Sequence, residues 1–444
     1  MKSQEDAVST YVELTPHLYR YLDAAHEIQR LAREIDTSEL KAEPFVDRFV
    51  SEADRLFPHL ASEHHREVGQ LLEHELRDHR AEIEAMSTGL APLAIDALDV
   101  EWLQGLKDAI DAVTSDSISS WFYLQVWPRV ARSRWGSDAL LPALLTTAIG
   151  DFEVLVARYV RSILTLRPQI LSKYERTYTI DEIRRFDDLD DLEAEAIADR
   201  AERLMTGGYE SWAQWLLERG VDVDGATRNP NPVILEAFQR RHLIVHKGGE
   251  VDSSYLRKVP NTALAVGDDA EVTSAYLVDV VDALTTVALK ISAASMKHFT
   301  KGSPPQIGSV FDFIVSQSTY TLLSNRQFEV VANFEEWAAP LRHDQLSRQI
   351  ATVNAWLARK RMGEFAAVQH DVESWDTDDL DPKFTLAKLI LTDKIAEAHA
   401  LARNLAEAGA LAEQEFLKWP LLEEVRDHDS LIQEASLRIT WHDH

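Results

Sequence analysis

Hydrophobic residues recur at helical intervals through the N-terminal part of the chain. The apolar positions are Tyr11, Leu14, Leu18, Leu22 and Ile28 over residues 5–36, and Val68, Leu71, Leu72 and Leu76 over residues 63–85. Such spacings return each set to one face of a helix. Pro58, Pro92 and the serine-rich segment 115–120 interrupt the pattern. We therefore expect a helical N-terminal region over residues 1–135.

The middle of the chain, residues 136–303, has the longest apolar-periodic segments. It opens with LLPALLTTAIGDFEVLVARYVRSILTL (140–166) and continues through an acidic segment into SWAQWLLERG (211–220). The run RRHLIVH (240–246) and a further apolar helix near 272–296 complete it. The pattern predicts a second, helical domain.

From residue 304 to 444 the sequence predicts helical hairpins. Segments 347–365 and 384–410 each predict a helix with small residues suited to close packing. The positions of Leu357, Gly363 and Phe365 resemble a degenerate tetratricopeptide pair, with a plain helical bundle as the alternative. Short alternating β-branched runs, which indicate strands, are nearly absent. We therefore predict an all-α fold, a central bundle flanked by two helical modules.

Composition and charge narrow the classes of protein. The chain of 444 residues carries a formal net charge of −28 and contains no cysteine, so it has no thiol ligand or nucleophile. We expect no apolar run of the roughly 18 residues that span a bilayer, and the start MKSQEDAVSTYVEL has no signal-peptide core. A cytoplasmic protein without membrane partners is expected. Such acidity excludes nucleic-acid binding by bulk charge, because affinity comes mainly from Lys and Arg on phosphates.

The segment NPNPVILEAFQRRHLIVHKGG (229–249) carries start and stop signals for one helix. Asn231 suits the N-cap, Pro232 the first helical position, and Gly248 with Gly249 the C-terminal cap. The expected buried positions are Ile234, Leu235, Phe238, Leu243 and Ile244, with Val245 as a further candidate.

Chemistry-bearing residues concentrate at the end of this helix. Arg241 and His246 are five residues apart, which separates them by about 140° around the axis and about 7.5 Å along it. His242 lies one turn before His246. A histidine that changes protonation state beside a guanidinium suits phosphoryl transfer, since one group moves the proton and the other stabilises the oxygens.

This motif, Arg241-His242-Leu-Ile-Val-His246 at a helix end, resembles the signature of HEPN ribonuclease domains. The resemblance extends over roughly residues 140–300, through KGGEVDSSYL (247–256), DFEVLVARYV (151–160) and GDDAEVTSAYLVDVVDAL (267–284). It implies a homodimer in which two motifs form one RNA-cleaving cleft. It also implies cleavage through the RNA 2′-hydroxyl, with a cyclic phosphate end and without metal or cofactor.

The resemblance also implies roles for the motif residues. His246 is the proton-transfer residue, Arg241 the transition-state clamp and His242 a supporting hydrogen-bonding residue. Arg240 fits a looser spacing to His246 and is the alternative to Arg241. Lys247 departs from the asparagine common in close relatives. Glu153, on the helix expected beside the motif, could orient an arginine or histidine, and a surface or capping acid is the alternative.

The resemblance places RNA cleavage in anti-phage defence or a toxin–antitoxin system. Expected partners are RNA, with tRNA as a candidate, a second copy of the chain, and a regulatory protein or antitoxin. The alternative is a non-catalytic scaffold that uses the HEPN unit to dimerise and the hairpins to bind a partner.

Other segments invite a functional interpretation and have a structural alternative. His74 and His79 are five residues apart, unlike the spacing of four in zinc-binding helices. His64 or His65 with Glu67 or Glu73 are the remaining candidate metal ligands. A solvated, charged helix is favoured over a metal site.

The acidic segment 187–202 holds eight carboxylates against Arg200, and a solvated face is again favoured. Core packing is favoured over base stacking for Trp121, Trp127, Trp135, Trp212 and Trp215. Basic residues of the middle domain that could face RNA are Arg158, Arg161, Arg167, Lys173, Arg176, Arg184, Arg185, Arg257 and Lys258.

Overall fold

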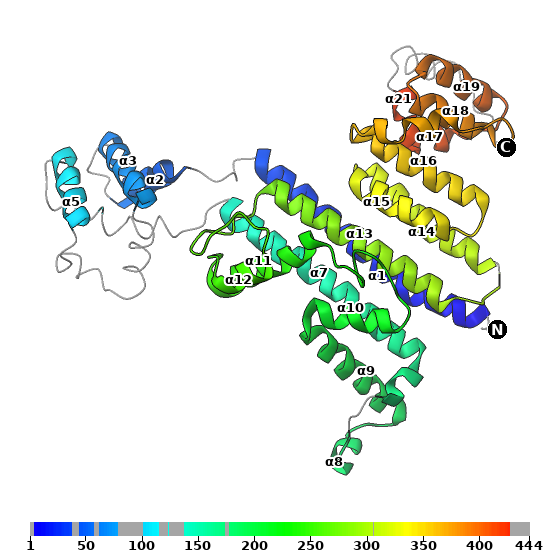
Figure 1. Ribbon diagram of the computed structural model, residues 1–444, viewed down its shortest axis with the longest axis horizontal. Helices are drawn as coiled ribbons and strands as arrows, with labels where there is room; N and C mark the ends of the chain where they lie inside the picture. The colour runs from blue at the N-terminus through cyan, green and yellow to red at the C-terminus, as the bar shows by residue number, and fades with distance from the viewer. Residues whose placement is uncertain are drawn as a thin grey trace. The chain divides into compact units, whose positions relative to one another are not determined.

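Helices make up most of the described part of the chain. A computed structural model describes residues 4–37, 44–56, 62–78, 101–114, 123, 137–173, 177–304 and 306–426 (Figure 1). Within those ranges β pairing is limited to two isolated bridges, Asp224 with Arg228 and Glu250 with Asp269. The all-α prediction is confirmed. The expected breaks at Pro58, Pro92 and 115–120, as well as Trp121, Trp127, Trp135, His79 and Arg176, lie outside the described residues.

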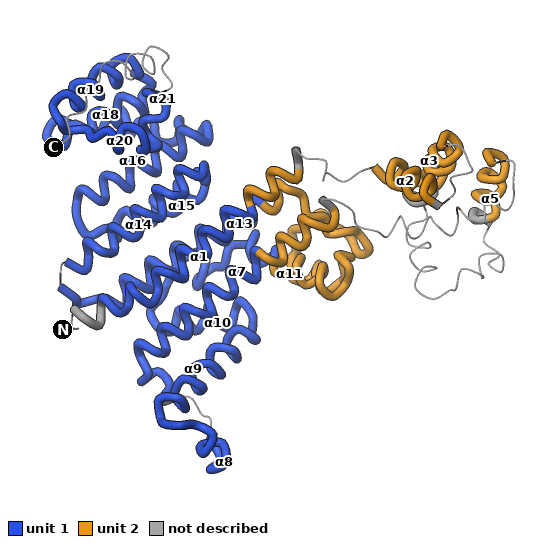
Figure 2. The backbone as a smooth tube through the Cα atoms, turned by 180° about the vertical axis from the view of Figure 1, so that it is seen from behind, with its two compact units in different colours: residues 1–28, 148–237, 278–444 blue, residues 29–147, 238–277 orange. Residues whose placement is uncertain are grey.

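The chain divides into two compact units, each made of discontinuous stretches. The first contains residues 1–28, 148–237 and 278–444, and the second contains residues 29–147 and 238–277 (Figure 2). The sequence predicts three consecutive domains, 1–135, 136–303 and 304–444. That these segments fold as separate domains stays a prediction.

The first unit is built on long helices. They are α1 (Gln4–Thr37), α7 (Ser137–Leu166) and α13 (Ser274–Phe299), with α1 beginning and α13 ending inside this unit. Tyr21 of α1 meets Phe152 of α7 edge to face, with ring centres 6.2 Å apart. Both views show α13 beside α1 (Figures 1 and 2). The apolar stripe read over 5–36 is therefore a core stripe, and its five named residues are all buried.

The aromatic stretch 211–220 supplies core residues to the same unit. It forms α10 (Gly208–Glu218), where Trp212 is fully buried and Trp215 nearly so. The Trp212 ring lies 4.3 Å from Tyr209 and 5.8 Å from Phe152, centre to centre. Core packing, not base stacking, is thus confirmed for these two tryptophans.

The acidic segment forms a solvated helix, as favoured. It is α9 (Leu189–Thr206), capped by Asp188 and buried only at Ile197, Ala201 and Leu204. Seven of the eight carboxylates are exposed and Asp199 is partly so. Before it come the short helix α8 (Ile180–Ile183) and the 3-10 turn η2 (Pro168–Lys173).

The C-terminal part of the first unit consists of short helices in hairpins. They are α14 (Gln306–Ser324), α15 (Phe328–Ala338), η3 (Ala339–Leu341), α16 (Gln345–Arg361), η4 (Phe365–Ala367), α17 (Gln369–Ser374), α18 (Pro382–Leu391), α19 (Ile395–Glu407), α20 (Glu413–Lys418), η5 (Pro420–Leu422) and α21 (Glu423–Arg426). The expectation of one helix over 384–410 is wrong. Asp393 is left-handed with φ 59°, and the Lys394 amide donates to the Leu389 carbonyl at 2.9 Å. This turn ends α18 and starts α19.

In the second unit, α2 (Phe45–Leu56), α3 (Ser62–Asp78) and α5 (Glu101–Thr114) pack in sequence. Phe49 is fully buried between Phe45, whose ring centre is 5.9 Å away, and Tyr123, at 6.0 Å. The expected helix over 63–85 is confirmed from its start to Asp78. The unit also contains the end of the RRHLIVH helix.

The helix α7 corrects one expectation. Its segment Asp138–Leu166 is long and apolar enough to cross a membrane by length and composition, contrary to the sequence analysis. The core helix of a soluble protein meets the same criterion, and 44% of its most apolar window is buried. The contacts that Phe152 makes with two aromatic rings favour this second explanation.

Candidate functional site

The motif helix begins and ends where the sequence predicts. It is α11 (Pro232–Lys247), and the Asn231 Oδ1 atom accepts a hydrogen bond from the Val233 amide at 2.9 Å. At the other end Gly248 and Gly249 have φ of 67° and 94°. The Gly249 amide donates to the Leu243 carbonyl, six residues back, at 3.1 Å, so the two left-handed glycines close the helix end.

The apolar side of α11 is also largely as expected. Ile234, Phe238 and Leu243 are buried, while Leu235 and Ile244 are partly buried. The suggestion that Val245 is buried is wrong, since it is 52% exposed. His246 and Lys247 are exposed as well, so the last turn of α11 faces mainly solvent.

The segment after the motif fixes the end of the helix. The Val251 amide donates to the Asp268 backbone carbonyl at 2.8 Å, and the Ala270 amide donates to the Gly249 carbonyl at 2.8 Å. Leu243, Val251, Tyr255 and Ala270 form one buried cluster. Because the left-handed glycines let the chain turn back at once, this small core lies against the last turn of α11 and holds it in place.

His242 and His246 form a pair on the surface of α11. Their ring centres are 4.8 Å apart and their planes are inclined by 53°. Both side chains are exposed. Residues four apart on a helix are neighbours on one face, so the expected grouping of two imidazoles near the helix end is observed.

The two adjacent arginines have different surroundings. The Arg240 guanidinium lies 4.2 Å from the centre of the Tyr276 ring and donates to the Glu271 carbonyl. The Arg241 guanidinium lies 5.7 Å from the Phe238 ring, one turn earlier on the same helix. Both are partly exposed. Arg240 thus ties α11 to the start of α13.

Asp252 is a neighbour of the motif that the sequence analysis did not single out. It caps α12 (Ser253–Lys258), accepting from the Tyr255 amide at 2.8 Å. That hydrogen bond is the main reason why the pKa of Asp252 lies below its ordinary value, and the charges of Lys247 and His242 lower the pKa further. The carboxylate therefore sits in the electrostatic field of the motif. Its position before a short SSYLRK helix is the signal that could have identified it as a cap.

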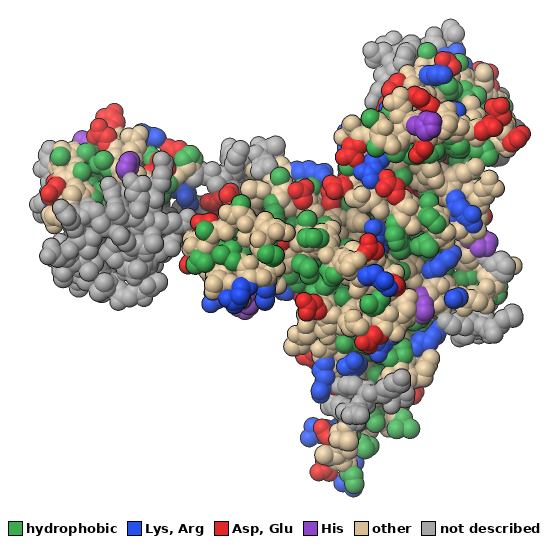
Figure 3. All heavy atoms as spheres, in the orientation of Figure 1, with side chains coloured by type: hydrophobic (Ala, Val, Ile, Leu, Met, Phe, Trp, Pro, Cys, Tyr) green, Lys and Arg blue, Asp and Glu red, His purple; other side chains and the backbone are tan. Residues whose placement is uncertain are grey.

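Basic side chains gather beside the histidine pair. Lys247 ends α11, Arg257 and Lys258 end α12, and all three are exposed. The space-filling view shows Lys, Arg and His side chains together at the edge formed by these helices (Figure 3). Residues 238–260 contain five Lys or Arg and two Asp or Glu. The end of α11 is therefore locally basic in an acidic chain, the condition under which a chain of this net charge could hold phosphates.

Glu153 belongs to a different compact unit from the motif residues. It is a partly exposed residue of α7 in the first unit, whereas the motif from Phe238 onward belongs to the second. Its expected role in orienting the arginine or histidine stays a prediction.

The histidine-rich segment 64–80 is not solvated at every histidine. His65 is fully buried, and its Nδ1 atom lies 2.6 Å from the Asp54 carboxylate. Its ring also meets Tyr123 edge to face, 5.7 Å centre to centre. A face described as solvated by the sequence thus includes a core histidine with an acidic partner.

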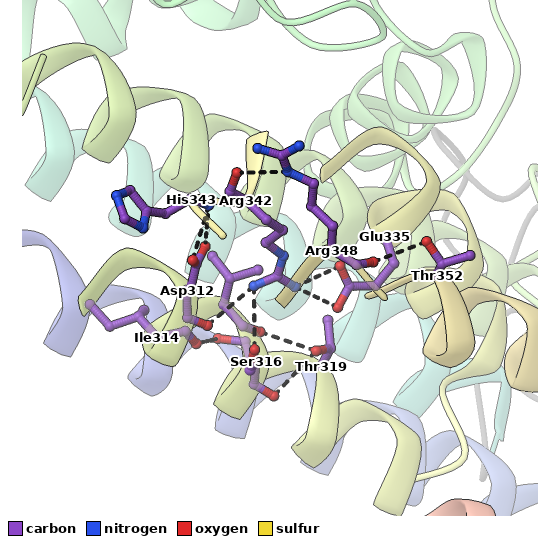
Figure 4. Close-up of polar contacts among 11 residues, drawn as sticks. Asp312, Ile314, Ser316, Thr319, Glu335, Arg342, His343, Arg348 and Thr352 are labelled. Carbon is purple, nitrogen blue, oxygen red and sulfur yellow. Dashed lines mark hydrogen bonds and ion pairs between the residues drawn. The ribbon is translucent and has the colours of Figure 1, made fainter. Parts of the chain in front are cut away.

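A different trio gathers ligand atoms within 4.8 Å of one another in the described residues: Asp312, His343 and Asp344. Figure 4 shows two of them, Asp312 and His343, with the polar contacts around them. Its carboxylates already have structural roles. Asp312 accepts from the His343 amide at 3.1 and 3.0 Å, and Asp344 caps α16 through the Ser347 amide at 2.7 Å. These contacts explain the cluster without a cation.

Next to this trio, Arg342 donates to both oxygens of Glu335 at 2.7 Å. Both side chains are fully buried. Arg342 also donates to the Asp312 carbonyl at 3.2 Å. The network joins α14, α15 and the start of α16, so we interpret it as part of the hairpin core.

Comparisons with known proteins add no family. A scan of family models found no match for this chain, and searches of the curated proteins and of the solved structures also found none.

Proposed function

We propose that this protein is a metal-independent endoribonuclease of the HEPN type, with Arg241 and His246 as its catalytic residues. The observation that carries the proposal is the exposed pair of His242 and His246 beside Arg241, at a basic helix end in a chain of net charge −28. Imidazole and guanidinium are the groups that move a proton and stabilise phosphoryl oxygens. The locally basic surface supports RNA as the substrate, because phosphates bind where Lys and Arg gather.

The chemistry is a transesterification within the RNA. His246 removes the proton of a 2′-hydroxyl, and that oxygen attacks the adjacent phosphorus. The bond from phosphorus to the 5′-oxygen breaks, and the leaving oxygen takes a proton from an imidazolium of the site. Arg241 donates to the phosphoryl oxygens, whose charge increases in the transition state. The products are a 2′,3′-cyclic phosphate and a 5′-hydroxyl.

The proposal includes a homodimer. On one helix Arg241 and His246 point about 140° apart, and the Arg241 guanidinium lies over the Phe238 ring, one turn earlier on the same helix. Two motif helices facing each other across a two-fold axis bring the arginine of one chain toward the histidines of the other. His242 then supports the phosphate or the ring of His246, and Lys247 adds phosphate affinity.

We place this activity in the cytoplasm, in anti-phage defence or a toxin–antitoxin system, with tRNA as the candidate substrate. The helical hairpins that follow α13 are the candidate binding region for a regulatory protein or antitoxin. This biological setting rests on the sequence resemblance alone.

The direct test uses purified full-length protein, labelled tRNA and an all-DNA analogue of the same sequence, in EDTA. We expect cleavage of the RNA only, and its loss in both His246→Ala and Arg241→Ala. His370→Ala is the matched control, because His370 is an exposed helical histidine far along the sequence from the motif. Cleavage that persists in both motif variants would exclude this site.

Expression in cells separates a silent enzyme from a scaffold. Wild-type protein that is toxic while His246→Ala is harmless supports a nuclease that needs a cellular trigger. If neither assay distinguishes the wild type from His246→Ala, the protein is a dimerising scaffold and the ribonuclease proposal is wrong.

A further inference from the structure

The histidine pair on α11 has the geometry of a metal chelate. Two histidines four residues apart on a helix present their rings on one face, the arrangement that zinc helices use. The ring centres of His242 and His246 are 4.8 Å apart. Zinc binds imidazole nitrogen at about 2.0–2.1 Å, so two nitrogens on one ion lie roughly 3–3.5 Å apart. Because both rings are exposed, each can turn about its side-chain bonds and direct a nitrogen at a shared ion.

The surroundings leave the pair accessible and anchored. Both rings are exposed, and the backbone beneath them is held by the cap from Gly249 to Leu243, 3.1 Å long. A rigid helix holds the two ligands in register before an ion arrives, which lowers the entropy cost of chelation. The Asp252 carboxylate, which interacts electrostatically with His242, offsets part of the positive charge that Lys247 adds.

We propose that His242 and His246 of one chain bind a divalent transition-metal ion, Zn²⁺ being the natural case. Neutral imidazoles select zinc, copper and nickel, whereas Mg²⁺ and Ca²⁺ require oxygen ligands. Two ligands come from the chain and water fills the remaining positions. The only described trio of ligand atoms within 4.8 Å lies elsewhere, at Asp312, His343 and Asp344, so Asp252 is not counted as a ligand.

Metal binding has a consequence for the proposed ribonuclease, and this part rests on the proposed function. A metal ion occupies the imidazole lone pair that His246 uses to accept a proton. Zn²⁺ is therefore a reversible inhibitor of an enzyme whose chemistry needs no metal, and EDTA restores activity. Mg²⁺ leaves the activity unchanged at the same concentration.

The binding test is isothermal titration of untagged full-length protein with ZnCl₂ at pH 7.5. We expect His242→Ala and His246→Ala each to weaken binding at this site at least tenfold, and His370→Ala to bind as the wild type does. His242→Cys provides the sharper control. The natural chain has no cysteine, and a thiolate is a zinc ligand, so His242→Cys should restore the binding that His242→Ala loses.

The outcomes separate this inference from the ribonuclease proposal. Equal zinc binding by the wild type, His242→Ala and His246→Ala, with thermal unfolding showing all three folded, overturns the metal site whatever the protein does to RNA. If zinc binding is lost in His242→Ala and His246→Ala but the wild type does not cleave RNA, the metal site is supported and the ribonuclease proposal is refuted. Zinc bound by the pair without any effect on RNA cleavage overturns the inhibitory role.

Discussion

The guanidinium of Arg240 lies 4.2 Å from the centre of the Tyr276 ring and donates to the Glu271 carbonyl. Its neighbour Arg241 lies over Phe238, on its own helix, at 5.7 Å. Two adjacent arginines of the same motif therefore have different contacts. The first joins α11 to the start of α13, and the second contacts a ring one turn earlier on α11.

Replacing each arginine in turn by alanine should distinguish a residue needed for stability from one needed for RNA cleavage. Arg240→Ala should lower the free energy of unfolding by about 1 kcal/mol, since a cation–π contact and a charged hydrogen bond are lost. Arg241→Ala should abolish RNA cleavage. Denaturant unfolding and a cleavage assay on both variants check this. The reverse result, an inactive and stable Arg240→Ala with an active Arg241→Ala, would move the catalytic role to Arg240.

The cap at Gly248 gives a second prediction. A β-carbon added there meets nothing within 4 Å, so Gly248→Ala costs only the left-handed backbone conformation at φ 67°. That cost is about 1 kcal/mol, and Gly248→Asn should cost less.

The matched control for this substitution is Gly150→Ala. Gly150 lies inside α7, and a β-carbon added there also meets nothing within 4 Å. There alanine should stabilise the protein by about 0.5–1 kcal/mol. Thermal unfolding of both variants should therefore show changes of opposite sign. Equal changes would contradict the cap geometry.

The buried pair of Glu335 and Arg342 gives a third prediction. Glu335→Ala leaves a guanidinium uncompensated in the hairpin core and should cost about 3–5 kcal/mol of unfolding free energy. Glu336→Ala is the adjacent control, because Glu336 pairs with Arg359 at 2.9 Å on a half-exposed side chain. It should cost no more than about 1 kcal/mol. The double variant Glu335→Leu with Arg342→Met should cost less than Glu335→Ala.

Asp252 gives a prediction on pH. Its pKa in the folded chain lies below the ordinary 3.8, first because of the Tyr255 amide and then because of Ser254, Lys247 and His242. A carboxylate with a lowered folded pKa contributes stability above its unfolded pKa and loses it as the pH falls through the folded value. The stability advantage of wild type over Asp252→Asn should therefore be present at neutral pH and decrease progressively as the pH falls below about 4. An advantage independent of pH would show that charge is not involved.

The motif helix shows what the sequence could predict. Asn231, Pro232 and the two glycines fixed its ends through local rules, and periodicity identified Ile234, Phe238 and Leu243 as buried. These inferences need only residues close together along the chain. The contact of the His242 and His246 rings follows equally from helical spacing.

The failures come from contacts between distant residues or from single backbone conformations. Arg240 and Tyr276 are far apart in sequence, so no local pattern links them. His65 looked like part of a solvated face, and only packing with Asp54 and Tyr123 buries it. The helix over 384–410 ends early because one residue, Asp393, is left-handed.

The chemical ends that the wild-type protein leaves on cleaved RNA, in EDTA, test the central claim most directly. Cleavage through the 2′-hydroxyl by His246 and Arg241 predicts a 2′,3′-cyclic phosphate on one fragment and a 5′-hydroxyl on the other. A 2′-deoxy substitution at the mapped cleavage position should block the cut, and His246→Ala should give no product. Fragments with a 5′-phosphate and a free 3′-hydroxyl, or an undiminished cut at the 2′-deoxy position, would contradict the account.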